Sequence, residues 1–375
     1  MDHNTPATTP KVTISFRDPR FVFIVLCLVA LLALPLSGSV YLTSLTAKIM
    51  IFAIAAASLD LIMGYGGMVS FGHAAFLGIG AYAVGVMSFY GINDGYLQFL
   101  VAIVGSALIG LLIGVLSLRT GGLYFIMITF AFSQMIYYLI ISLEPYGGDD
   151  GMNTERSDFG LFDLNQNLLG PSEGSRDMQL IYYLTLAVLI LTVLILRRFV
   201  NSRFGMVLRG AQSNEPRMQS IGFSTFRYRL TGFVIAGAIC GVGGALWANH
   251  QEFVTPEYMH WFRSGEIMVM VIAGGMGTII GAVVGAFGIL IVEELIKQIQ
   301  IDTVINFGVF ELPIKYNGQE SWEFIFGPML ILLVLFARGG LIGLASPESL
   351  DRMKAFAARR LRLGAKPVSK PGGAE

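Results

Sequence analysis

The sequence predicts an all-α integral membrane protein, a bundle of about ten transmembrane segments of which some are broken or short. Composition is the first reason: 54% of the 375 residues are hydrophobic and 13% are charged, whereas soluble domains carry about 25% charged residues. Apolar runs of spanning length are the second, since a hydrocarbon core about 30 Å thick needs about 20 apolar residues per helix. The third is the charge of the connecting segments, which is basic on one side of this topology and acidic on the other.

The apolar runs predict spans at about residues 21–38, 43–63, 71–90, 98–118, 122–143, 179–196, 230–249, 265–275, 278–296 and 322–337. The eighth run is too short to cross a bilayer unaided, and it ends in a glycine-rich break at residues 274–277. The third run follows a similar break at residues 64–67. The first run has an alternative interpretation as a cleaved signal peptide, because two arginines precede it and Ser37, Gly38 and Ser39 follow it.

Lysines and arginines predict the orientation, since they are enriched in cytoplasmic loops. The segment 197–229 holds seven arginines against one acidic residue, Glu215, whereas 144–178 holds eight acidic residues against two arginines. We therefore expect both termini in the cytoplasm. The predicted domains are a cytoplasmic N-terminal arm (1–20), a transmembrane domain (21–343) and a basic cytoplasmic tail (344–375), with 144–178 periplasmic and 197–229 cytoplasmic.

Several chemistries find no support in the residues. Cys27 and Cys240 lie in apolar spans, the four histidines lack metal-ligand spacing, and no phosphate-binding loop motif is present. We expect no catalytic residue, no metal, no cofactor and no nucleic-acid partner. The spans contain few ionisable residues, and Asp60 is interpreted as interfacial, near the end of its span. This argues against a proton-coupled secondary transporter or a charged ion channel and favours an uncharged or zwitterionic solute whose energy comes from elsewhere.

The first glycine break is polar at membrane depth, where irregular backbone is tolerated only if it is buried in protein or lines a cavity. Two interpretations stay open for it, a lining of the translocation path and a packed helix break. Under the first interpretation, the candidate path residues are Tyr65, Gly66, Gly67, Ser70, His73, Gln134, Gly274, Gly275 and Gly277.

The basic segment 197–229 also contains a predicted short helix. Glu215 stands beside Pro216, which suits a first helical turn, and Gly222 is a natural stop. Met218 and Ile221 at i, i+3 spacing would form a small apolar patch. Such a helix fits a docking element for a partner groove. The alternative is that the arginines only satisfy the positive-inside bias.

Four stretches carry a family resemblance. They are residues 64–76, 122–135, 205–246 and 272–278, the third including Asn214-Glu215-Pro216-Arg217, Ile221-Gly222 and Arg227-Tyr228-Arg229-Leu230. Together they resemble LivM-type permease subunits of branched-chain amino acid ABC importers over about residues 40–343. That resemblance implies a bacterial inner-membrane location, a second permease subunit, ATPase subunits and a periplasmic solute-binding protein.

In that family the segment 197–229 contains the coupling helix, which docks on the ATPase. The resemblance assigns coupling here to Arg209, Asn214, Glu215, Arg217, Ile221 and Gly222. The sequence departs from the family at Gln212, where an arginine is often found. Branched-chain or related hydrophobic amino acids are the expected solutes. Similar permeases carry urea, short amides or aromatic compounds, and a stand-alone secondary transporter is the alternative from another class.

Overall fold

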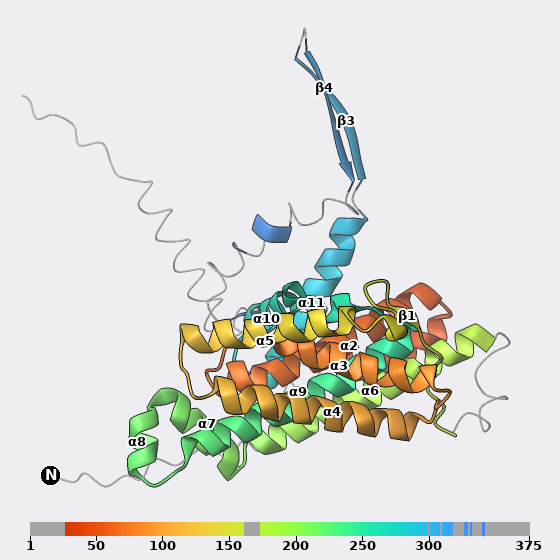
Figure 1. Ribbon diagram of the computed structural model, residues 1–375. Helices are drawn as coiled ribbons and strands as arrows, with labels where there is room; N and C mark the ends of the chain where they lie inside the picture. The colour runs from red at the N-terminus through yellow and green to blue at the C-terminus, as the bar shows by residue number, and fades with distance from the viewer. Residues whose placement is uncertain are drawn as a thin grey trace, which may run out of the picture.

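The computed structural model describes residues 27–160, 173–298, 300–307, 310–317, 326–328, 331 and 340–341. The N-terminal arm, the basic tail and most of the tenth predicted span lie outside these described residues. Helices occupy the other predicted spans (Figure 1). They are a short apolar helix at Cys27–Leu36, ending in η1 (Leu34–Ser37), then α2 (Val40–Met63), α3 (His73–Phe89), α4 (Gly95–Ser117), α5 (Leu123–Ile141), α6 (Glu173–Val200), α9 (Thr225–Gln251), α10 (Trp261–Gly274) and α11 (Ile279–Lys297).

The predicted count of about ten spans is not confirmed. Within the described residues, six helices are long and apolar enough to cross a membrane, namely α2, α4, α5, α9, α11 and the part of α6 from Met178 onward. Three helices at predicted spans are shorter, namely the one at Cys27–Leu36, α3 with 17 residues and α10 with 14. Both α3 and α10 adjoin a glycine break, and a helix shortened by a break needs its neighbours to satisfy the exposed backbone.

The described residues are mostly helical, and they also include two short pairs of strands that were not predicted. Strand β1 (Met152–Asn153) pairs with β2 (Phe253–Val254), and β3 (Gln300–Phe307) pairs antiparallel with β4 (Phe310–Asn317). The β3–β4 hairpin extends away from the helices (Figure 1). Its strands mix β-branched and aromatic residues with polar ones, which favours pairing over membrane insertion. A search for long apolar runs does not detect such short strands.

Helix α2 lies at the centre of the bundle. Its most apolar stretch is 89% buried, against 28% for α4 and 17% for α5, and it packs against α6, α9, α10 and α11. Helices α4 and α5 present exposed apolar side chains along most of their length. The outer faces therefore suit lipid or other subunits, while α2 is enclosed by this chain alone.

Close helix contacts depend on glycine, since apolar lipid leaves van der Waals packing between small residues as a main driving force. Helices α3 and α9 approach so closely that a Cβ atom at Gly244 would overlap the carbonyl oxygen of Leu77, and one at Gly80 would overlap that of Gly241. Helices α10 and α11 meet in the same way at Gly274 and Gly281.

We predict that Gly244→Ala lowers the stability of the detergent-solubilised chain, because the new methyl group would force α3 and α9 apart. Overpacking typically costs about 1–3 kcal/mol, which should appear as a fall of several degrees in the melting temperature. The matched control is Gly265→Ala in α10, where no atom lies within 4 Å of the added Cβ. It should be neutral or slightly stabilising. Equal melting temperatures for both variants would contradict the packing argument.

Candidate functional site

The basic segment folds into two short helices, α7 (Arg203–Ser213) and α8 (Glu215–Ser220). They lie at the end of the bundle where α4 connects to α5 (Figure 1). Helix α7 is fixed against the end of α6, since Arg209 Nη2 donates to the carbonyl oxygen of Val200 at 3.1 Å. A Cβ at Gly205 would overlap that same carbonyl. Arg209 therefore orients α7 by contacts within the chain.

The predicted short helix is confirmed as α8. Asn214 caps it, because its Oδ1 accepts a hydrogen bond from the backbone N–H of Arg217 at 3.0 Å. Pro216 occupies the first turn. Gly222 has a φ of +97°, a left-handed conformation that strains other residues, so it ends the helix as predicted.

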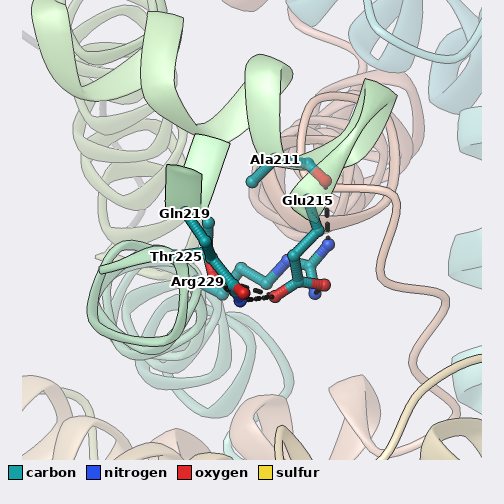
Figure 2. Close-up of polar contacts among 5 residues, drawn as sticks. All are labelled: Ala211, Glu215, Gln219, Thr225 and Arg229. Carbon is teal, nitrogen blue, oxygen red and sulfur yellow. Dashed lines mark hydrogen bonds and ion pairs between the residues drawn. The ribbon is translucent and has the colours of Figure 1, made fainter. Parts of the chain in front are cut away.

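Glu215 joins three helices (Figure 2). Its Oε2 forms an ion pair with Arg229 Nη1 of α9 at 2.7 Å, and its Oε1 accepts from Thr225 Oγ1 at 2.8 Å and from Gln219 Nε2 at 3.4 Å. Arg229 Nη2 also donates to the carbonyl oxygen of Ala211 in α7, at 3.1 Å. The carboxylate therefore binds α7, α8 and α9 into one unit. The sequence analysis placed Glu215 at a helix start but did not anticipate its pairing with Arg229.

The outward face of α8 differs from the predicted apolar patch. Met218 is half-buried and packs towards α7, where a Cβ at Gly210 would lie 2.7 Å from its sulfur. Ile221, in contrast, is 64% exposed, and Phe223 beside it is 38% exposed. Arg217 is also exposed. Met218 therefore stabilises the loop, and the exposed surface around the end of α8 includes Arg217, Ile221 and Phe223.

The first glycine break folds tightly onto the end of α2. The backbone N–H groups of Gly64 and Tyr65 both donate to the carbonyl oxygen of Asp60, at 2.8 and 3.2 Å. Gly67 has a φ of +67°, and a Cβ at Gly66 would lie 2.7 Å from the carbonyl oxygen of Ile62. Tyr65 is half-buried. The break is thus a compact turn with ordered backbone.

Ser70 and His73, which follow the break, are fully buried. His73 Nε2 lies 2.8 Å from Ser58 Oγ, and Ser70 Oγ accepts from the N–H of Gly72 at 3.3 Å. The first turn of α3 is held by α10, because Ser264 Oγ accepts from the N–H of Ala74 at 2.9 Å. These contacts favour the packed interpretation of Ser70 and His73. Their role in a translocation path stays a prediction, as does that of Gln134, a half-buried residue of α5.

The two glycine breaks meet each other. Asp60 Oδ1 accepts a hydrogen bond from the backbone N–H of Gly277 at 2.8 Å, and Asp60 is 0% exposed. Asp60 is therefore enclosed by protein in the last turn of α2, and its position near a membrane interface stays a prediction. Gly275 and Gly277 have φ values of +115° and +77°, so this second break needs glycine at both positions. The hydrogen bond to the Asp60 carboxylate therefore brings the path candidates at residues 64–67 close to Gly277.

A further contact links the breaks to the loop. Gln212 of α7 donates from Nε2 to the carbonyl oxygen of Gly64 at 3.3 Å. The sequence analysis treated Gln212 only as a departure from the family pattern. Its spacing from Gly64, 148 residues along the chain, gave no local signal of this contact.

Known proteins resemble the chain over most of its length. Residues 41–335 match a family described as a branched-chain amino acid transport system permease component. The chain is 26% identical over 362 residues to the high-affinity branched-chain amino acid transport system permease protein LivM of Escherichia coli K12, covering 90% of this chain and 80% of that protein. It is 21% identical over 327 residues to a probable LivM permease of Methanocaldococcus jannaschii, covering 78% and 90% respectively. The corresponding LivH permease of Escherichia coli K12 is 23% identical over 323 residues, covering 78% and 91%.

The matched region contains α3 to α11, all but the first residue of α2, both glycine breaks and the α7–α8 loop. The six long apolar helices agree with the membrane location of a permease. This chain is a multi-pass membrane protein that belongs to the family of branched-chain amino acid transport system permease components.

Proposed function

We propose that this chain is a permease subunit of an ABC importer that moves branched-chain or related hydrophobic amino acids across a bacterial inner membrane. It pairs with a second permease subunit, takes solute from a periplasmic solute-binding protein and is driven by separate ATPase subunits. The chain itself holds no cofactor and hydrolyses no ATP. Family membership and the transport names of the relatives support this proposal. The main structural support for the proposal is the α7–α8 loop. Contacts of Glu215 with Thr225 and Arg229 hold the loop in place, and its exposed face is both basic and apolar.

The charge of the loop supports a cytoplasmic position for α7 and α8, since seven arginines lie between residues 197 and 229. The connection from α4 to α5 lies at the same end of the bundle (Figure 1), and it contains Arg119. The acidic segment 144–178 would then be periplasmic. With ten spans between residues 21 and 343, both termini are cytoplasmic, and residues 344–375 form a basic tail near anionic lipid.

The loop residues divide into two groups by their contacts. Arg209, Asn214, Glu215 and Gly222 fix the shape of the loop. Arg217 and Ile221 are exposed and meet the ATPase directly, together with Phe223. A short amphipathic helix of this kind suits an apolar groove with acidic groups at its rim.

The translocation path is proposed along the two glycine breaks. It includes Tyr65, Gly66, Gly67, Ser70, His73, Gln134, Gly274, Gly275 and Gly277. The hydrogen bond from Gly277 to Asp60 supports a path whose two halves move together. Conformational change driven by the ATPases would open the bundle alternately to each side.

The proposal predicts ATP-driven uptake only by the complete assembly. In proteoliposomes containing this chain, its second permease, the ATPases and the binding protein, labelled leucine should accumulate when ATP is present. Accumulation should stop when a substitution in the ATPase blocks hydrolysis. Uptake by this chain alone, without ATP, would instead identify a secondary transporter. Labelled urea and benzoate in parallel reactions distinguish the amide and aromatic permease alternatives.

A further prediction concerns the contacts of Glu215 with Gln219, Thr225 and Arg229. Glu215→Lys places a positive charge beside Arg229 and removes the acceptors for Thr225 and Gln219. We expect membrane insertion to be retained while ATP-driven uptake falls at least tenfold. Glu215→Gln is the matched control, because it keeps a hydrogen-bond acceptor at the same position, and it should retain most of the uptake. Normal uptake by Glu215→Lys would contradict a coupling role for the loop.

The third prediction concerns the exposed face of α8. Ile221→Asp places a charge on the proposed apolar contact without disturbing the bonds of Glu215. We expect the affinity for the ATPase subunits, measured by co-purification from detergent at graded concentrations, to fall about tenfold. Ile92→Asp is the control, since Ile92 is an exposed apolar residue in the turn between α3 and α4. Equal capture of the ATPase by both variants would exclude Ile221 from the interface.

A further inference from the structure

Four residues from three distant parts of the chain meet beneath the α7–α8 loop. We name this cluster the Asp60 junction, and it consists of Asp60, Gly64, Gln212 and Gly277. Gln212 Nε2 donates to the carbonyl oxygen of Gly64 at 3.3 Å, the N–H of Gly64 donates to the carbonyl oxygen of Asp60 at 2.8 Å, and Asp60 Oδ1 accepts from the N–H of Gly277 at 2.8 Å. The junction therefore connects α7 to both glycine breaks by consecutive hydrogen bonds.

The residues of the junction are closely packed around Gly64. A Cβ at Gly64 would overlap both the Asp60 carboxylate and the backbone of Gly277. A Cβ at Gly67 would lie 2.8 Å from Cγ of Gln212. Asp60 is fully buried, and packed interiors transmit displacement, so a shift of the first break is passed on to Gly277. The exposed Gln212 is joined to this break by its hydrogen bond to Gly64 and its contact with Gly67.

The carboxylate of Asp60 fixes the position of Gly277 in the junction. A fully buried polar group is costly unless it is hydrogen-bonded. Gly277 lies between α10 and α11, so its N–H is not part of either helix and needs an acceptor from elsewhere. Asp60 supplies it from the last turn of α2. The position of the second break is thereby tied to the end of the central helix.

We propose that Gln212 is the positioning residue that transmits movement of the α7–α8 loop, through Gly64 and Asp60, to both glycine breaks. This inference rests on the proposed function, since it assumes that an ATPase moves the loop. It assigns Gln212 an inward task, separate from the outward face formed by Arg217 and Ile221. An amide at position 212 fulfils this task because it carries an N–H donor of the right reach.

Variants of Gln212 in the complete importer test the proposal. Gln212→Glu keeps the size of the side chain but offers no donor to Gly64. We expect normal capture of the ATPases and continuing ATP hydrolysis, with solute transported per ATP reduced at least fivefold. Gln212→Arg retains N–H donors and should keep at least half of the normal ratio. Ser213→Ala is the local control, because that hydroxyl only donates to Arg209 of its own helix, and its ratio should be unchanged.

Hydrogen exchange provides a readout that a mere loss of stability would not reproduce. In the wild-type complex, binding of a non-hydrolysable ATP analogue should change exchange in peptides covering residues 64–67, 215–222 and 275–278. In Gln212→Glu, the change at 215–222 should remain and the change at 275–278 should disappear. A normal ratio of transport to hydrolysis in Gln212→Glu, or an unaltered response at 275–278, overturns the inference while leaving the proposed function intact. Failure of the wild-type chain to capture any ATPase would instead overturn the proposed function itself.

Discussion

The enclosure of α2 is the constraint on which the rest of the structure depends. Lipid tails are as apolar as side chains, so helices in a bilayer are held by close packing and hydrogen bonds rather than by exclusion of water. A helix surrounded by α6, α9, α10 and α11 can satisfy this only if its neighbours approach closely. Glycines let these neighbours pack closely with the helices beside them, as Gly244 of α9 does against Leu77 of α3 and Gly274 of α10 does against Gly281 of α11. Once α2 is fixed, its last turn is a rigid reference point, and Asp60 projects from that turn to hold the second glycine break.

Charged side chains of α10 and α11 form ion pairs within their own helices. Arg263 pairs with Glu266 at 2.6 Å within α10, and Lys297 pairs with Glu293 at 2.5 Å within α11. Both pairs span one helical turn, so each ion pair is closed within its own helix. In the proposed function the energy for transport comes from separate ATPase subunits, which is why the loop and its connection to the breaks matter.

The sequence predicted local features well and distant contacts poorly. Helix positions, the two glycine breaks and the short helix ending at Gly222 follow from apolar runs, glycine and capping residues, all of which act within a few positions. The pairing of Glu215 with Arg229, the burial of Asp60 and the contact of Gln212 with Gly64 join residues that are distant in the sequence. No periodicity reports such contacts. The β3–β4 hairpin was missed for another reason, because its short strands resemble an ordinary polar connection.

In the proposed function the α7–α8 loop has to be stiff and also has to bind a partner, and different residues of the loop meet these two requirements. A single half-exposed ion pair contributes only about 0.2–1 kcal/mol, so the pair of Glu215 and Arg229 alone would not hold three helices together. It acts within a network that also includes Thr225, Gln219 and the carbonyl of Ala211, and shared hydrogen bonds reinforce one another in a partly buried site. Stiffness therefore comes from polar groups that face inward. In the proposed function, affinity for the ATPase comes from the exposed apolar area of Ile221 and Phe223, which lies outside this network.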